Sequence, residues 1–106
     1  MQTVYEPTTG SSEMTAFLSA LIAFRNGRPG VRLPMEWTGV AGKVADAFND
    51  VVELNERMAL ELARLSRVVG KEGKLSQRAK LGDVSGFWQE SIESVNDLID
   101  DLVHPT

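Results

Sequence analysis

The chain has 106 residues, 42% of them apolar and 25% charged, which is ordinary for a globular protein of one domain or two very small ones. It has no cysteine and one histidine, His104, which excludes disulfides and thiol catalysis and argues against a catalytic triad or a multi-histidine metal site. The net charge of −4 attracts neither nucleic acid nor an anionic membrane, and the longest apolar run, residues 16–24, is about half the length of a membrane span. We therefore expect a cytoplasmic segment that binds no cofactor, metal or nucleic acid and does not insert into a membrane.

A first helix is predicted after a flexible leader of residues 1–12, where a proline, a glycine and small hydroxylated residues occur without a period. Ser12 is the expected N-cap, and Asn26-Gly27 is the expected end of the helix. The apolar residues at helical spacing are Met14, Phe17, Leu18, Leu21, Ile22 and Phe24. A helix of about three turns is unstable alone in water, so it must pack against another element.

Residues 27–39 are predicted to form an extended connector, because their glycines and prolines are incompatible with a helix. The apolar residues in alternation are Val31, Leu33, Met35 and Trp37, which leaves an edge strand as the alternative. Because no second convincing strand is available for pairing, we favour a connector whose apolar side chains lie on neighbouring helices.

The next segment predicts one long helix. Residues 40–69 contain no proline and have a glycine only in the first turn, which predicts a continuous helix of about 45 Å. Mostly apolar residues follow one another along this helix at alternating spacings of four and three, as in a left-handed coiled coil. This stripe consists of Val44, Phe48, Val51, Asn55, Met58, Leu62, Leu65 and Val69. Asn55 is either a buried polar residue that sets the register or a rim residue with Leu54 in its place. The stripe requires a partner helix, because one helix has no core of its own.

A second connector and a last helix complete the chain. Gly70 and Gly73 are expected to end the long helix, and residues 74–83 form an irregular stretch with Leu75 and Leu81 as its apolar members. The last helix is predicted to stop before Pro105. Its apolar stripe, which also needs a partner, consists of Val84, Trp88, Ile92, Val95, Ile99 and Leu102.

An internal repeat is found when the sequence is shifted by 44 residues, which aligns segment 40–44 with 84–88 and Phe48 with Ile92. The chain is then helix, connector and helix, twice, with the middle helix shared. Connectors of about a dozen residues are long enough to lead back along a helix, so the two helices of a unit are expected to run parallel. Two copies of such a unit would close a four-helix bundle, which predicts a homodimer.

One stretch of the long predicted helix has the sequence Gly42-Lys43-Val44-Ala45-Asp46-Ala47-Phe48-Asn49. It resembles the start of the second helix of HAMP domains, the signal-relay units of sensor histidine kinases, chemoreceptors and adenylyl cyclases. Residues 64–106 are similar to the tandem HAMP arrays of hybrid histidine kinases, and residues 32–58 are similar to the unit before such an array. The chain departs from the family pattern at Asn26-Gly27-Arg28, where Gly-Asp is usual, and at Ile92-Glu93, which stands in place of Phe-Asn.

The resemblance implies an all-α fold of two consecutive HAMP units, residues 13–58 and 59–106, that share a continuous middle helix. Each unit would be a parallel four-helix coiled-coil bundle formed by a homodimer. The implied function is non-catalytic signal relay within a hybrid histidine kinase of a two-component phosphorelay, through switching of helix packing. Its implied partners are a second copy of the chain and the adjacent HAMP, sensor and kinase domains of the parent.

Two sets of residues are predicted to build this arrangement. The dimer-core seam comprises Phe17, Leu21, Phe24, Val44, Phe48, Val51, Met58, Leu62, Leu65, Val69, Trp88, Ile92, Val95, Ile99 and Leu102. The connector anchors are Gly27, Val31, Leu33, Gly42, Gly73, Leu75, Leu81 and Gly86. No catalytic, cofactor-binding or metal-binding residue is predicted.

Two alternative functions are compatible with parts of the same pattern. A static dimerisation or adaptor bundle would need the same seam as a signal relay. A second alternative comes from Trp37-Thr38-Gly39, which resembles the WxG turn of small helical-hairpin substrates of specialised secretion systems. Such hairpins have one turn between two long helices, whereas this chain has two glycine-rich breaks, so we favour the relay.

Overall fold

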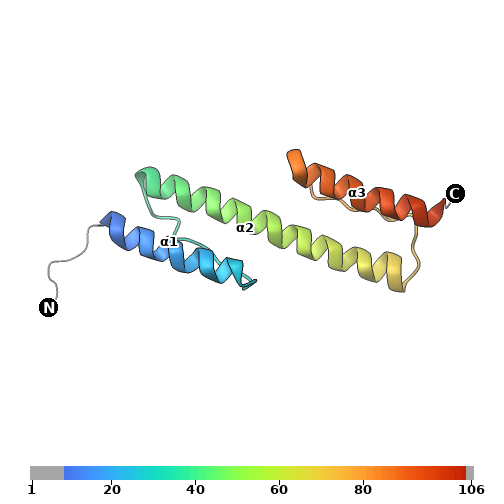
Figure 1. Ribbon diagram of the computed structural model, residues 1–106, viewed down its shortest axis with the longest axis horizontal. Helices are drawn as coiled ribbons and strands as arrows, with labels where there is room; N and C mark the ends of the chain where they lie inside the picture. The colour runs from blue at the N-terminus through green and yellow to red at the C-terminus, as the bar shows by residue number, and fades with distance from the viewer. Residues whose placement is uncertain (1–8, 105–106) are drawn as a thin grey trace. The chain divides into compact units, whose positions relative to one another are not determined.

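The structure is a computed structural model that describes residues 9–104, with side chains from residue 12 onwards. The described residues form no strand, so the all-α class is confirmed for this part of the chain and the edge strand considered for residues 31–37 is wrong. Figure 1 shows the elements in chain order: α1 (Thr9–Arg25), α2 (Gly39–Leu65), the π-helical turn η1 (Ser66–Lys71) and α3 (Gly86–Val103).

Several helix boundaries differ from those expected. The first helix already begins at Thr9, so Ser12 lies inside it and is not its N-cap, whereas residues 1–8 of the expected leader lie outside the described residues. Gly70 does not end the long helix, because η1 carries the helical chain on to Lys71. The helix ends at Gly73 instead, whose φ of 69° is a left-handed conformation that only glycine adopts without strain.

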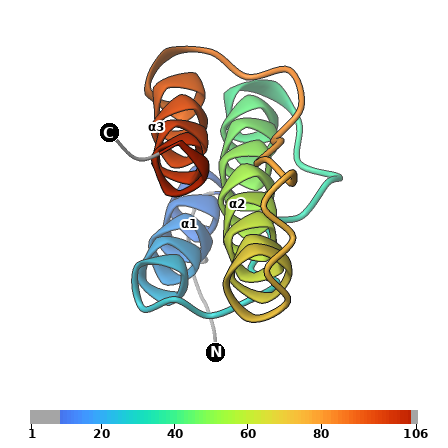
Figure 2. The ribbon, with the colours of Figure 1, turned by 90° about the vertical axis from the view of Figure 1, so that its right-hand side faces the viewer.

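The chain divides into two compact units, one up to Glu56 and one from Arg57. In the first unit, α1 and the N-terminal part of α2 run in the same direction, and residues 26–38 connect them (Figure 1). In the second unit, the C-terminal part of α2 and α3 also run in the same direction, and residues 72–85 follow η1 as the connector. Figure 2 shows both connectors as extended, irregular chain. Each unit therefore has the parallel helix pair that the connector length predicts.

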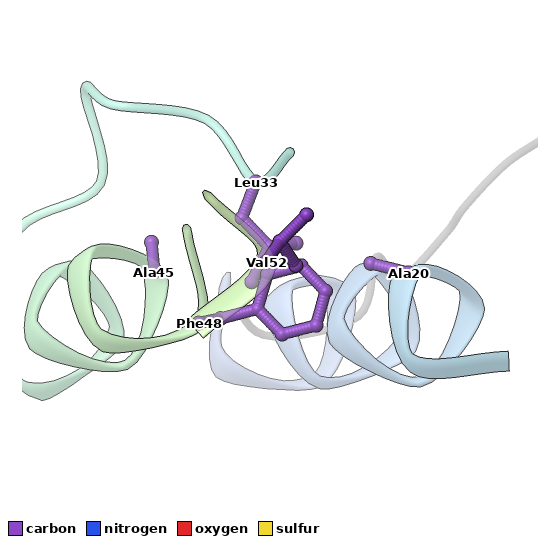
Figure 3. Packing of buried hydrophobic residues seen from close by; sticks show 5 residues of the cluster. All are labelled: Ala20, Leu33, Ala45, Phe48 and Val52. Atoms are coloured by element: carbon purple, nitrogen blue, oxygen red, sulfur yellow. The ribbon is translucent and has the colours of Figure 1, made fainter. Parts of the chain in front are cut away.

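The core of the first unit lies between both helices and the connector. Its buried members are Ala20 of α1, Leu33 of the connector, and Ala45, Phe48 and Val52 of α2 (Figure 3). Val52 has no exposed surface at all. Two further rings pack edge-on against Phe48, with centroids 5.8 Å away for Phe17 and 6.1 Å away for Phe24. The connector thus supplies a side chain to a core that the two helices alone leave open.

The second unit has a separate core of similar construction. Its buried members are Leu65, Val68, Val69, Ala79 and Ile99. Here too a connector residue, Ala79, is buried together with residues of the two helical segments. The predicted helix–connector–helix organisation is thus present twice, each time with its own core.

Candidate functional site

The connector of the first unit is held by one side chain of α2. The amide nitrogen Nδ2 of Asn49 donates to the carbonyl oxygen of Leu33 at 3.0 Å, and the backbone N–H of Leu33 donates to Oδ1 of Asn49 at 2.8 Å. One asparagine therefore satisfies both polar backbone groups of a residue whose side chain is buried in the core. We call this two-bond arrangement a connector clamp.

The second unit contains a connector clamp of the same design. Nδ2 of Asn96, on α3, donates to the carbonyl oxygen of Ala79 at 3.1 Å, and the N–H of Ala79 donates to Oδ1 of Asn96 at 2.6 Å. Ala79, like Leu33, is a buried connector residue. In both units the second helix therefore fixes the connector by an asparagine directly after an apolar residue.

The two clamps correct the register of the internal repeat. The sequence alignment with a shift of 44 places Asn49 opposite Glu93, whereas the clamps pair Asn49 with Asn96. The glycines at the helix starts agree with the clamps, because Gly39 and Gly86 both have a left-handed φ, 63° and 61°. The shift of 44 was wrong because it aligned Gly86 with a glycine inside the first turn of α2.

That internal glycine, Gly42, has a packing role of its own. A Cβ atom at Gly42 would lie 2.5 Å from the carbonyl oxygen of Trp37, closer than real Cβ atoms approach a backbone atom. The first turn of α2 can therefore pack this closely on the connector only if residue 42 has no side chain.

An ion pair adds a second attachment in the first unit. A guanidinium nitrogen of Arg32 lies 2.8 Å from a carboxylate oxygen of Glu56, and the N–H of Gly30 donates to the same carboxylate at 2.7 Å. The hydrogen bond from Arg32, followed by that from Gly30, lowers the pKa of Glu56 below its usual range. Glu56 is thus held as an anion that binds the connector at two points.

In the second unit, a network around Glu61 serves the same purpose. Glu61 forms an ion pair with Arg64 at 2.8 Å and accepts the N–H of Lys80 at 2.7 Å. The hydrogen bond from Arg64 is the main cause that lowers the pKa of Glu61. Arg64 also donates to Oε1 of Gln77 at 2.9 Å and to the carbonyl oxygen of Arg78 at 2.9 Å.

Two further arginines tie the second connector to the helices on either side. Arg57 of α2 donates to the carbonyl oxygen of Leu81 at 2.8 Å. Arg78 of the connector pairs with Asp100 of α3 at 2.7 Å. These arginines are therefore engaged in structural contacts. The described residues contain no cluster of three or more acidic or histidine side chains suited to a metal.

Each unit also carries apolar side chains that its own core does not cover. In the first unit, Leu18 of α1 is 56% exposed and Val51 of α2 is 47% exposed. In the second, Leu62 of α2 is 44% exposed and Leu98 of α3 is 63% exposed. Both helices of each unit thus leave large apolar side chains outside the cores of the single chain.

The predicted seam residues differ in burial within a single chain. The buried ones are Phe48, Leu65, Val69 and Ile99. The half-buried ones are Phe17, Phe24, Val44, Met58, Trp88, Ile92 and Val95. The exposed ones are Leu21, Val51, Leu62 and Leu102. One chain thus uses part of this set for its own cores and leaves the rest at the surface.

The predicted connector anchors also differ in their surroundings. Leu33 and Leu81 are buried, Val31 packs against the first core, and Leu75 is exposed. Left-handed glycines are found at Gly27, Gly73 and Gly86. Asn55, whose place on the stripe was left open, is half-buried and donates from Nδ2 to the carbonyl oxygen of Val51 at 2.8 Å.

Several residues of these attachments were missed by the sequence reasoning. Asn96, Glu56 and Glu61 received no role, because each is a polar residue on a helix and none belongs to a known catalytic pattern. A signal for the clamps was present, since Phe48-Asn49 and Val95-Asn96 are both an apolar residue followed by asparagine. No such signal marks Glu56 or Glu61 as connector attachments, because the backbone N–H groups that they accept lie 26 and 19 residues away along the chain.

No protein-family model matches this chain, and no solved structure matches it. Among the helices that the structure describes, none combines the length and the apolar character needed to cross a membrane.

Proposed function

We propose that this chain is a pair of tandem HAMP-type units that relays a signal, without catalysis, within a sensor or hybrid histidine kinase. The observation that carries the proposal is the duplicated unit of two parallel helices and a returning connector, with an asparagine clamp in each copy. A parallel helix pair with a long connector is the arrangement that the HAMP resemblance implies. In the corrected register Val95-Asn96 takes the place of the Phe48-Asn49 pair, whereas Gln89 stands in place of Gly42.

The proposal includes a second copy of the chain as the partner. A parallel pair of helices leaves one side of its apolar surface open, and here that surface includes Leu18, Val51, Leu62 and Leu98. In each unit, closing a four-helix bundle with the same helix pair of a second copy would cover the exposed apolar side chains of that unit. Burial of a fully exposed side chain of this size contributes about 1.5–3 kcal/mol, and these side chains, about half exposed in the single chain, would each contribute about half as much.

The attachments of the connector suit a relay. In the first unit, Asn49 and Glu56 fix the connector to α2. In the second unit, Asn96 fixes the connector to α3 and Glu61 fixes it to the C-terminal part of α2. A rotation of these helices therefore carries the connector with it. Close-packed interiors pass between discrete arrangements and do not deform continuously. We therefore propose that a packing change at one end of α2 favours a matching change at its other end.

Disulfide cross-linking tests the parallel homodimer. The natural chain has no cysteine, so a single introduced cysteine gives an unambiguous result. In a parallel bundle, Val51→Cys on one copy faces the same residue of the second copy and should form a disulfide under mild oxidation. Asp50→Cys, one residue earlier on the exposed face of α2, is the matched control and should stay reduced. Equal cross-linking at both positions would contradict the proposed interface.

Cross-links at two rotational positions separate a relay from a static adaptor. Leu54 and Asn55 are adjacent and half-buried, so cysteines there lock the helices about 100° apart. The chain would be placed ahead of the catalytic core of a sensor histidine kinase, and autophosphorylation would be measured with each lock. Activity that differs between the two locks supports the relay. Activity that is the same with both locks supports static dimerisation instead.

A further inference from the structure

The two units end their first helices in different ways. In the first unit, Gly27 is left-handed, its N–H donates to the carbonyl oxygen of Phe24, and the N–H of Arg28 donates to that of Ala23. These two bonds, around a left-handed glycine, form the Schellman motif that commonly ends a regular α-helix. The first unit therefore has an ordinary helix end.

The second unit ends its corresponding helix through a wider turn. Gly73 is again left-handed, but the N–H of Lys74 donates to the carbonyl oxygen of Val68, one residue further back than in the first unit. The N–H of Glu72 donates to the carbonyl oxygen of Arg67, which is the five-residue spacing of a π-helix. This turn contains one residue more than the regular end.

The extra residue can be identified by alignment of the two ends. The first unit has Arg25 and Asn26 between the core residue Phe24 and the glycine, whereas the second has three residues between Val69 and Gly73. Lys71-Glu72-Gly73 corresponds to Arg25-Asn26-Gly27, which leaves Gly70 without a counterpart. Single-turn π-helices are typical of one residue inserted into an α-helix, and they are frequent at functional positions.

We propose that this helix end is a two-state element, in which the chain caps its helix either at Gly73, through the π turn, or at Gly70, through a regular Schellman end. Gly70 is helical in the first state and, being glycine, can take the left-handed conformation of the second. The second state transfers residues 71–73 to the connector.

Little holds the helix end in one of these states. The buried residues Val68 and Val69 precede both caps, and the attachments of the connector to the helices begin at Gln77. The core of the second unit therefore stays intact in either state. Within residues 9–104, the side chain of Glu72 pairs with Arg67 at 3.3 Å and Lys74 at 3.1 Å, and such surface pairs contribute little. The element lies within one chain and needs no signal, so its test is independent of the proposed relay.

Amide hydrogen exchange, followed residue by residue by NMR, tests the two states. The N–H groups of Glu72 and Lys74 are bonded only when the cap is at Gly73, so they should exchange faster than that of Arg28 in the regular end. Gly70→Ala removes the second cap and favours the helix, and a Cβ at this position meets open space. It should slow the exchange of both amides about fivefold. Ser66→Ala, the control in the same turn, should change it no more than about twofold.

A second pair of variants keeps the proposal testable by stability. Gly73→Ala and Gly27→Ala each place alanine at a left-handed position with open space around it. Gly73→Ala leaves the cap at Gly70 available, whereas the first unit has no glycine three residues before Gly27. Gly27→Ala should therefore lower the midpoint of thermal unfolding more than Gly73→Ala does. Equal losses in the two variants, or exchange at Glu72 and Lys74 that does not respond to Gly70→Ala, would overturn the two-state helix end.

Discussion

At the level of single residues, the two asparagine clamps are the features that most directly relate sequence to architecture. A buried stretch of connector has no regular backbone partners, so its N–H and carbonyl groups need side chains to bond with. An asparagine carries one donor and one acceptor at a separation that fits both groups of a single residue. Asn49 and Asn96 use this chemistry in the same way in the two units.

Removal of one clamp gives a direct prediction for stability. Asn96→Ala should lower the free energy of unfolding by about 1–3 kcal/mol, because the N–H and carbonyl of Ala79 lose their partners in a partly buried place. Urea denaturation followed by circular dichroism measures the loss. The control is Asp97→Ala, the exposed neighbour on α3, which should change stability by less than about 0.5 kcal/mol. Equal effects of the two substitutions would mean that the clamp does not hold the connector.

The lowered pKa of Glu61 predicts how stability depends on pH. A carboxyl group whose pKa is lower in the folded chain stabilises the fold above its unfolded pKa of about 4.3, and this contribution is lost as the pH falls through the folded pKa. Wild type should therefore exceed Glu61→Gln in unfolding free energy at pH 7, and the difference should shrink below about pH 4. Urea titrations at several pH values measure it. A difference that is independent of pH would contradict the role given to the Arg64 ion pair.

At the level of elements, the helices follow from local patterns, whereas the connectors depend on distant contacts. Glycine and proline positions predict where helices break, and apolar spacing predicts which residues face a partner. Val84, expected in the last helix, lies before α3, which starts at Gly86, and the spacing of apolar residues gave no sign of the π turn after Leu65. A local pattern carries no information about an anchor such as Glu61, which bonds a residue 19 positions away.

The packing of α1 on α2 can be tested at Phe48. This ring is buried and contacts Phe17 and Phe24, so Phe48→Ala should cost about 3–5 kcal/mol and lower the melting temperature. Thermal unfolding followed by circular dichroism detects the change. Phe87→Ala, which removes an exposed phenylalanine from α3, is the matched control and should have a much smaller effect. An unchanged melting temperature in Phe48→Ala would remove this residue from the core.

At the level of the whole molecule, the proposed dimer makes the clearest prediction. Exposed apolar side chains on both helices of each unit are costly in water unless a partner covers them. Sedimentation equilibrium over a hundredfold range of concentration should give a mass near twice 11.6 kDa. Val51→Asp, which places a charge on the proposed interface, should shift the mass towards that of one chain. A wild-type mass of one chain at every concentration would exclude the bundle and favour a helical hairpin.

The sequence by itself determined the all-α class, the three helical segments and the twofold helix–connector–helix order, because these depend on the spacing of apolar residues and on breaks at glycine and proline. Only the tertiary structure decided the register of the repeat, the clamps at Asn49 and Asn96 and the wide turn that contains Gly70. The clamps join residues 16 or 17 positions apart, and the wide turn contains one residue more than the regular helix end of the first unit. Their energies come from contacts between elements, which a periodic pattern along one element does not contain.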